Sequence, residues 1–301
     1  MTKFSPATLI FALVLPACGY ADRNPGSTQG EAQARAAVSP FKNPVAMSAS
    51  VEHPLDLSPP EPSEVLRAIY KKEGDGSSSY DIGNEVWVSY WYGHAYRVAG
   101  HQYFTGFAYN TEASSGDGAE GSAPGDLVSI SQATYAISPK GSVTVWEFVS
   151  EEHGIGRFGG RGRANAIEEN HEPITHLAAG GVYMLAVPTW YLEGGTRISV
   201  SEVFLLNRER HKWQYLGSVS TGEDNSAGCA DGGSEDEGLP PCAVNIGKLE
   251  FYQRPGETMP SIRVVRKGRV VDTRGKTREL DSLDVYEYVY DQVTSKYKLA
   301  G

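Results

Sequence analysis

Short segments rich in β-branched and aromatic residues, separated by turn residues, fill the chain from about residue 80 to its end. About ten of them are long enough to predict strands. They span residues 84–93, 103–110, 127–138, 142–150, 180–192, 196–207, 212–221, 245–253, 261–272 and 284–291. No helical segments alternate with them, which argues against the parallel sheets of Rossmann and TIM-barrel folds. The sequence therefore predicts a mainly β domain: an antiparallel sandwich, a barrel or a small propeller.

One short helix is predicted before the first strand. Pro62-Ser63-Glu64 has the composition of a helix start, with Ser63 as the N-cap, and Gly74 can end the helix. The apolar residues between them fall on one helical face, at Val65, Leu66, Ile69 and Tyr70. This pattern predicts a helix that packs on a sheet.

The charge of the chain is strongly negative. Its 301 residues carry 27 Lys and Arg against 37 Asp and Glu, a formal net charge of −10. Such a surface is repelled by DNA, RNA and anionic lipid, so nucleic-acid binding is not expected. No stretch approaches the ~20 apolar residues of a transmembrane helix.

Residues 1–17 have the features of an export signal. Lys3 supplies the positive charge, and the apolar run from Ala7 to Ala17 is too short to span a hydrocarbon core of ~30 Å. Residues 18–62 are rich in Pro, Ala and Ser and predict a flexible tether. We therefore expect a single β-rich domain over residues 63–301.

The end of this leader reads Leu15-Pro16-Ala17-Cys18-Gly19 and resembles the lipobox of bacterial lipoproteins. The resemblance covers residues 1–19. It implies a diacylglycerol on the Cys18 thiol, cleavage before that residue and anchoring to a membrane. Pro16 departs from the pattern, in which Ala, Ser or Thr is usual. By analogy with enteric lipoproteins, Gly19 in the position after the cysteine implies the outer membrane, facing the periplasm.

Two other interpretations of the leader stay open. Gly19-Tyr20-Ala21 has the small-x-small pattern of an ordinary cleavage site, which would release the protein without Cys18. Alternatively, the leader remains attached as an uncleaved anchor, although it is short for that role.

Cys229 and Cys242 are the other two cysteines. Export would place them in an oxidising compartment, where a disulfide forms and persists. The turn-rich segment between them can bring its ends together. A metal pair and two free thiols are the alternatives, but neither close C-x₂-C spacing nor a nearby histidine supports a metal.

The stretch from His153 to Arg163 is rich in glycine and carries Arg157, Arg161 and Arg163. It contains a literal G-x-G-x-x-G, but the glycines and arginines that follow disfavour the helix that dinucleotide binding requires. A mobile loop with three arginines can grip a carboxylate or phosphate of a ligand or partner. The alternative is a solvated loop whose arginines pair with the nearby acids Glu151, Glu152, Glu168 and Glu169.

The segment 87–104 is dense in aromatic residues, and Trp87, Trp91 and Tyr96 form a candidate surface for stacking on sugar rings. Both faces of this segment are apolar, so a central strand covered on both sides is the competing explanation. His171 and His176 are five residues apart with Pro173 between them, which excludes the helical zinc-protease motif. We expect no metal site and no cofactor.

No catalytic motif is evident, so we assign no catalytic residues. The leading hypothesis is an envelope-anchored, non-enzymatic lipoprotein whose β-rich domain binds a protein or glycan partner, such as an inhibitor or immunity protein. This resembles that class in layout only. The alternatives are a hydrolase of envelope polymers and a structural subunit of an envelope assembly.

The anchor has a direct test. Lipidation of this kind requires a thiol, so Cys18→Ser should move the protein from the membrane fraction to the soluble fraction. Ultracentrifugation of lysed cells measures this, and the mass of the N-terminal peptide reports the lipid. An unchanged distribution would exclude the anchor.

Overall fold

The computed structural model describes residues 57–84, 86–111, 125–138, 145–178, 181–230, 238–272 and 275–300. These ranges belong to one unit of the chain, Val51–Gly301. The leader, Cys18 and most of the predicted tether lie outside the described residues. None of the helices in the described ranges has the length and apolarity needed to cross a membrane.

The predicted helix is present as α1, Pro62–Tyr70, and buries Val65, Leu66 and Ile69. The prediction of its N-cap was wrong. Glu61, not Ser63, occupies the N-cap position and makes no side-chain capping bond. Proline suits the first helical position, because an N–H there has no partner within the helix. Lys71, in the left-handed conformation, ends the helix before Gly74 is reached.

The first sheet is a meander of five antiparallel strands in chain order. Its strands are β1 (Ser79–Asp81), β2 (Trp87–Val98), β3 (His101–Thr111), β4 (Val128–Ile137) and β5 (Trp146–Phe158). The last strand is longer than predicted, because it continues through the first part of the glycine-rich stretch. Gly156 lies within it, where the ring of Tyr215 from the other sheet packs so closely that a Cβ atom would lie 2.4 Å from it.

The second sheet has ten strands and is also antiparallel. Its main path runs in the order β15-β14-β12-β11-β10-β9-β8-β6, with β13 paired to β12 and β7 paired to β8. The strands are β6 (Ala166–Ile167), β7 (Ile174–Leu177), β8 (Tyr183–Glu193), β9 (Thr196–Asn207), β10 (Lys212–Asp224), β11 (Val244–Tyr252), β12 (Ser261–Val271), β13 (Thr277–Leu280), β14 (Val285–Asp291) and β15 (Lys296–Leu299). Neither sheet closes on itself, so the fold is a β sandwich and not a barrel or propeller.

Pro188 lies in the middle of β8, where a residue without an N–H normally disrupts pairing. The pairing explains why it is tolerated. On one side of β8, β7 pairs with it as far as Ala186, and β6 pairs with it from Thr189 onward. Pro188 therefore lies in the gap between these two partner strands. Its carbonyl oxygen still accepts a hydrogen bond from the backbone N–H of Glu168 at 3.0 Å.

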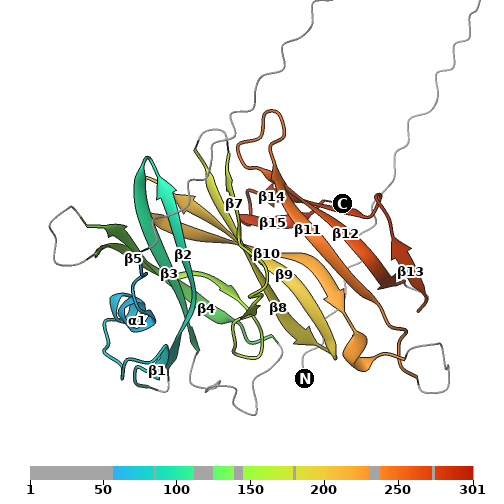
Figure 1. Cartoon of the computed structure of the whole chain (residues 1–301), viewed down its shortest axis with the longest axis horizontal. Coiled ribbons are helices and arrows are strands. Elements are labelled where there is room, and N and C mark those ends of the chain that lie inside the picture. The colour runs from blue at the N-terminus through green and yellow to red at the C-terminus, as the bar shows by residue number, and fades with distance from the viewer. Residues whose placement is uncertain are drawn as a thin grey trace, which may run out of the picture. The chain divides into compact units, whose positions relative to one another are not determined.

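Figure 1 shows the helix α1 and the strands of the two sheets, and three hydrophobic clusters hold these layers together. The first lies between α1 and the small sheet and includes Leu66 and Phe104. The second lies between the two sheets, where Phe107 of β3 packs on Phe204 of β9 with ring centroids 4.9 Å apart. The third joins two parts of the large sheet to each other, and Ile262 belongs to it.

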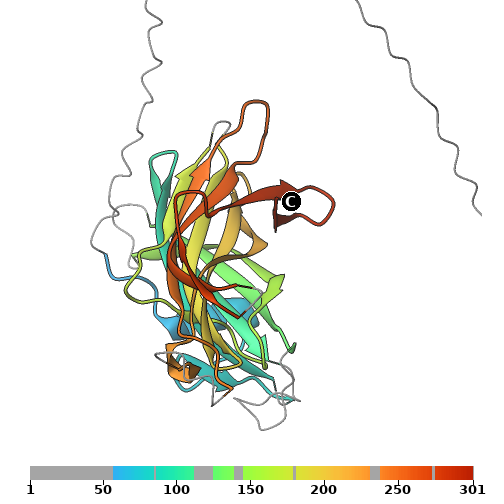
Figure 2. The same cartoon turned by 90° about the vertical axis from the view of Figure 1, so that its right-hand side faces the viewer.

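The large sheet divides between β10 and β11. These strands pair over only three residues, Gly222–Asp224 against Val244–Ile246. Outside this short pairing the two strands belong to different parts of the sheet. The strands β8, β9 and β10 form the first arm, and the strands β11 to β15 form the second arm. Figure 2 looks onto the second arm, whose orange and red strands lie in front of the yellow strands of the first arm. The third cluster fills the space between the arms.

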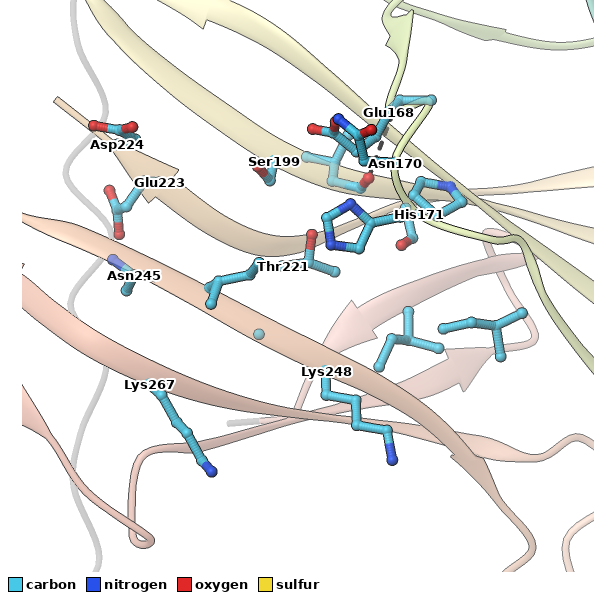
Figure 3. A pocket seen from close by; sticks show the side chains of 18 of the residues that line it. Glu168, Asn170, His171, Ser199, Thr221, Glu223, Asp224, Asn245, Lys248 and Lys267 are labelled. Atoms are coloured by element: carbon cyan, nitrogen blue, oxygen red, sulfur yellow. Dashed lines mark hydrogen bonds between the residues drawn. The ribbon is translucent and has the colours of Figure 1, made fainter. Parts of the chain in front are cut away.

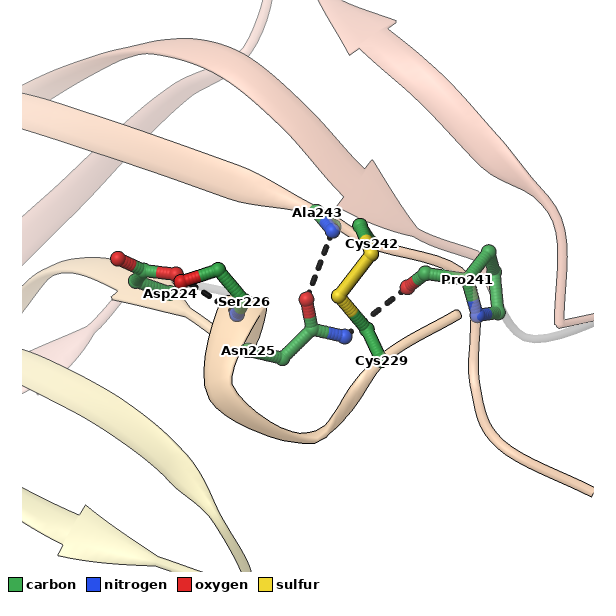
Figure 4. The surroundings of a disulfide bond; sticks show 7 residues. All are labelled: Asp224, Asn225, Ser226, Cys229, Pro241, Cys242 and Ala243. Atoms are coloured by element: carbon green, nitrogen blue, oxygen red, sulfur yellow. Dashed lines mark hydrogen bonds between the residues drawn. A yellow bond between two sulfur atoms is a disulfide. The ribbon is translucent and has the colours of Figure 1, made fainter. Parts of the chain in front are cut away.

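A disulfide joins the segment that follows β10 to the segment that precedes β11. Cys229 and Cys242 are bonded, as predicted, with Cα atoms 4.9 Å apart (Figure 4). The Asn225 side chain connects the same two segments, because its Nδ2 donates to the Pro241 carbonyl oxygen at 3.0 Å and its Oδ1 accepts from the Ala243 N–H at 2.7 Å. The disulfide and the Asn225 side chain together hold the junction of the two arms.

Removing this disulfide should weaken the fold. The double variant Cys229→Ser/Cys242→Ser should lose ~3 kcal/mol of unfolding free energy, because its unfolded chain is no longer closed into a loop. Urea denaturation followed by tryptophan fluorescence measures this. Cys18→Ser is the matched control, since it removes a thiol and keeps the bond. Equal midpoints for the two variants would contradict the prediction.

Candidate functional site

A cleft of ≈ 790 Å³ opens on one face of the large sheet, where the second arm leaves the first. A row of paired residues runs across the sheet beneath the cleft. Ser199 of β9 pairs with Gly222 of β10, Gly222 pairs with Ile246 of β11, and Ile246 pairs with Lys267 of β12. Residues paired in this way point to the same face of a sheet. Ser199, Ile246 and Lys267 of this row line the cleft.

The floor of the cleft is apolar although it faces solvent. Val244 and Ile246 on β11 are 44% and 59% exposed. Pro188, Leu249 and Val265 also line the cleft. Exposed aliphatic side chains that line one hollow are typical of surfaces that bind an apolar group.

The segment between β6 and β7 forms one wall. Figure 3 shows the imidazole of His171 directed into the cleft toward Thr221, with Glu168 and Asn170 behind it. The hydroxyl of Thr221 and the imidazole are the hydrogen-bonding groups nearest the centre in this view. A ligand in the cleft therefore meets an apolar floor and a polar wall.

Charged groups of both signs lie at the rim. Glu223 and Asp224 lie at one end, and Lys248 and Lys267 on the side opposite the polar wall (Figure 3). Hydrogen bonds from the hydroxyl and backbone N–H of Ser226 lower the pKa of Asp224 below its usual value, which keeps this carboxylate charged. The separated charges would orient a ligand or partner segment in the cleft.

The three arginines of the predicted loop do not line this cleft. Arg157 lies near the end of β5, and its guanidinium donates to the Leu127 carbonyl oxygen at 3.4 Å. Arg161 and Arg163 lie in a tight turn, in which the backbone groups of Gly160 and Arg163 pair in both directions at 3.0 Å. The stretch is thus the end of a strand followed by a tight turn, so the prediction of one continuous loop was wrong, whereas a role of these arginines in binding an anion or partner stays a prediction.

Three of the four nearby acids have other partners. The nitrogen–oxygen distance is 2.9 Å between Lys71 and Glu151 and 3.4 Å between Lys212 and Glu152, and Arg197 pairs with Glu168. Among the described residues, Arg157, Arg161 and Arg163 therefore form no ion pair with these acids. All three are exposed, so the end of β5 and the turn after it present positive charge without an ion-pair partner among the described residues.

The three residues of the candidate aromatic surface have different environments. Tyr96 is 2% exposed and lies in the core between the sheets, so it cannot contribute to a surface. Trp91 is half-buried, and its Nε1 donates to the Asn165 carbonyl oxygen at 2.9 Å. Trp87 begins β2 and is also half-buried. Trp91 and Tyr96 are five residues apart, so alternation alone would place them on opposite faces of the strand. Both contact the core between the sheets because a bulge shifts the register between Tyr90 and Tyr92.

The two histidines do not come together as metal ligands. His171 points into the cleft, whereas the ring of His176 stacks on Phe251 at 5.5 Å. Burial lowers the pKa of His176. Among the described residues, no group of three or more His, Cys, Asp or Glu side chains is arranged to hold a metal ion.

A buried carboxyl group that the sequence analysis missed lies between the sheets. Glu202 of β9 is 0% exposed, and its Oε2 accepts hydrogen bonds from the hydroxyls of Tyr215 at 2.6 Å and Ser218 at 2.7 Å. Residues three apart on a strand normally point to opposite faces. A bulge between Tyr215 and Gly217 turns both hydroxyls toward the same carboxylate.

A signal for this residue is present in the sequence. Glu202 alternates with the buried residues Val200, Phe204 and Leu206, and the last two belong to the core between the sheets. An acid at such a position must be protonated or hydrogen-bonded. Burial raises the pKa of Glu202 above its usual value, and its hydrogen bonds act in the opposite direction.

Comparison with known proteins identifies no relative. No family model matches the chain, and neither the curated proteins nor the solved structures contain a significant match. The functional argument therefore depends on the cleft and its surroundings.

The raised pKa of Glu202 predicts a pH dependence of stability. A carboxyl whose folded pKa lies above its unfolded value of 4.5 contributes most below that pH and loses this contribution as the pH rises. The unfolding free energy of the wild type, relative to Glu202→Gln, should therefore fall between about pH 4 and pH 7. Urea denaturation of both proteins across this range measures it, and a constant difference would contradict the prediction.

Proposed function

We propose that this chain is a non-enzymatic binding protein of the bacterial cell envelope, held at a membrane by a lipid on Cys18. Its β domain binds an apolar segment of a partner protein in the cleft on the face of the large sheet where the second arm leaves the first. The observation that carries this proposal is the exposure of Val244 and Ile246 on the floor of a ≈ 790 Å³ cleft. Covering such side chains is favourable by roughly 25 cal/mol per Å² of apolar surface.

A protein segment fits this cleft better than a small apolar ligand. The rim carries acids at one end and lysines on another side, so a segment with charged residues beside its apolar ones would find complementary partners. Backbone amides of a bound segment would also meet the hydroxyl of Thr221 and the imidazole of His171. An inhibitor or immunity protein of the envelope is one concrete form of this function.

The carboxyl groups favour binding over hydrolysis. A general acid needs a raised pKa and access to the substrate. In the part of the chain that the structure describes, a raised carboxyl pKa is found at Glu202 alone, and that side chain is fully buried. In the cleft, hydrogen bonds lower the pKa of Asp224 and of Glu250, which suits permanently charged contacts.

The proposed location at the envelope is supported by two separate features. The motif ending at Cys18 resembles a lipobox, and the Cys229–Cys242 disulfide suits an oxidising compartment. A lipid anchor and a tether would place the cleft near the membrane while leaving it free to reach a partner. Outer-membrane attachment facing the periplasm remains part of this proposal.

Site-specific photo-crosslinking in intact cells tests the cleft. A photoreactive phenylalanine derivative at Ile246 should form an adduct with a protein whose crosslinked peptide contains apolar residues. The same probe at Val293, which is 94% exposed and does not line the cleft, is the matched control. Absence of a protein adduct specific to position 246 would contradict the proposal.

Substitution of a residue on the cleft floor tests how much the cleft contributes to the affinity for the crosslinked partner. Ile246→Asp should weaken binding of the crosslinked partner by roughly 10- to 100-fold, because an aliphatic side chain contributes ~1.5–3 kcal/mol when fully buried. Val293→Asp should leave it unchanged. Both substituted side chains are exposed, so the fold should persist, and circular dichroism checks this.

A further inference from the structure

A second pocket, of ≈ 580 Å³, lies beside the cleft and has a different chemical character. It is lined by aromatic and polar side chains, among them Trp91, Tyr109, Trp190, Glu169, Asn170 and Arg197. The cleft and this pocket share Glu168, Asn170 and Arg197. The ion pair between Glu168 and Arg197 therefore borders both of them.

Neighbouring groups hold the aromatic side chains of this pocket in place. The Nε1–H of Trp91 donates to the Asn165 carbonyl oxygen at 2.9 Å, and the edge-to-face contact between Trp91 and Phe158 has a centroid distance of 4.8 Å. Trp190 is fixed by the guanidinium of Arg197, which lies 4.5 Å from its ring centroid. Rigid aromatic side chains lose little entropy when a ligand packs on them.

Hydrogen-bonding groups without partners surround these aromatic side chains. The Nε atom of Arg197 is buried and has no hydrogen-bond partner among the described residues. The side chains of Glu169 and Asn170 are exposed and form no hydrogen bond or ion pair within the described ranges. A carboxylate accepts, a guanidinium donates and a carboxamide does both. The pocket thus offers donors and acceptors close to aromatic rings.

We infer that this pocket binds a pyranose unit of an uncharged saccharide. A sugar ring carries C–H groups that pack on aromatic faces and hydroxyls that both donate and accept hydrogen bonds, which matches the two kinds of group present. An anionic sugar is disfavoured, because Glu169 is unpaired and the charge of Arg197 is already compensated by Glu168. The volume is within the range of small-molecule sites.

This site is separate from the apolar cleft of the proposed function. The saccharide would contact Trp91, Trp190 and Glu169, none of which lines the cleft. Either site can therefore fail without the other. Because Arg197 and Asn170 border both, occupancy of one pocket should alter affinity at the other.

Saturation-transfer NMR on the full chain tests the inference. The probes are three uncharged trisaccharides, namely the β-1,4-linked trimers of N-acetylglucosamine and of glucose, and maltotriose. At least one should show saturation transfer to its ring protons. Asn170→Ala and Glu169→Ala should each weaken its binding by roughly 3- to 10-fold, the effect of one lost hydrogen bond.

Glu193→Ala is the matched control, since Glu193 is an exposed carboxylate near the end of β8 that lines neither pocket. It should bind the saccharide as the wild type does. Ile246→Asp should also keep saccharide binding, which separates this site from the cleft. Absence of transfer for all three probes, or equal binding by the wild type and both pocket variants, would overturn the inference.

Discussion

The short junction between β10 and β11 is the constraint on which the functional face depends. Only three residues of each strand pair, and the strands then separate into two arms. A Cβ at Gly222 would lie 2.5 Å from the Asn245 carbonyl oxygen, so the close approach requires glycine there. The disulfide and the Asn225 side chain hold this junction from outside. The cleft exists because the strands diverge while their ends remain joined.

Side chains of the second arm form hydrogen bonds with the separated part of β10. Lys296 of β15 donates from its Nζ to the Tyr215 carbonyl oxygen at 2.7 Å, and its ammonium lies 4.1 Å from the Tyr215 ring centroid. Arg266 of β12 donates to the Ser220 hydroxyl at 2.6 Å. These contacts bring polar side chains of the second arm to the first arm, while the third hydrophobic cluster fills the space between them. The arms therefore form a structural unit with a defined cleft.

The strand content was predictable because it is encoded locally. Each of the ten predicted segments overlaps a strand, and α1 was placed from its apolar face. The strands β1, β6, β7, β13 and β15 were missed, because segments of two to four residues are too short to show a period and depend on a neighbour for pairing. The cleft was also missed. Ser199, Thr221 and Ile246 are ordinary strand residues until non-local pairing brings them to one face.

Sequence alone determined the mainly β character, the antiparallel tendency, the short helix and the disulfide partners, since only two cysteines follow the leader motif. Tertiary structure decided the rest. Strand order, the division into two arms, the burial of Tyr96 and Glu202, and the position of Trp91 beside a polar pocket all depend on register and bulges. The physical reason is that alternation specifies two faces of a strand, whereas which face is buried depends on segments far away in the chain.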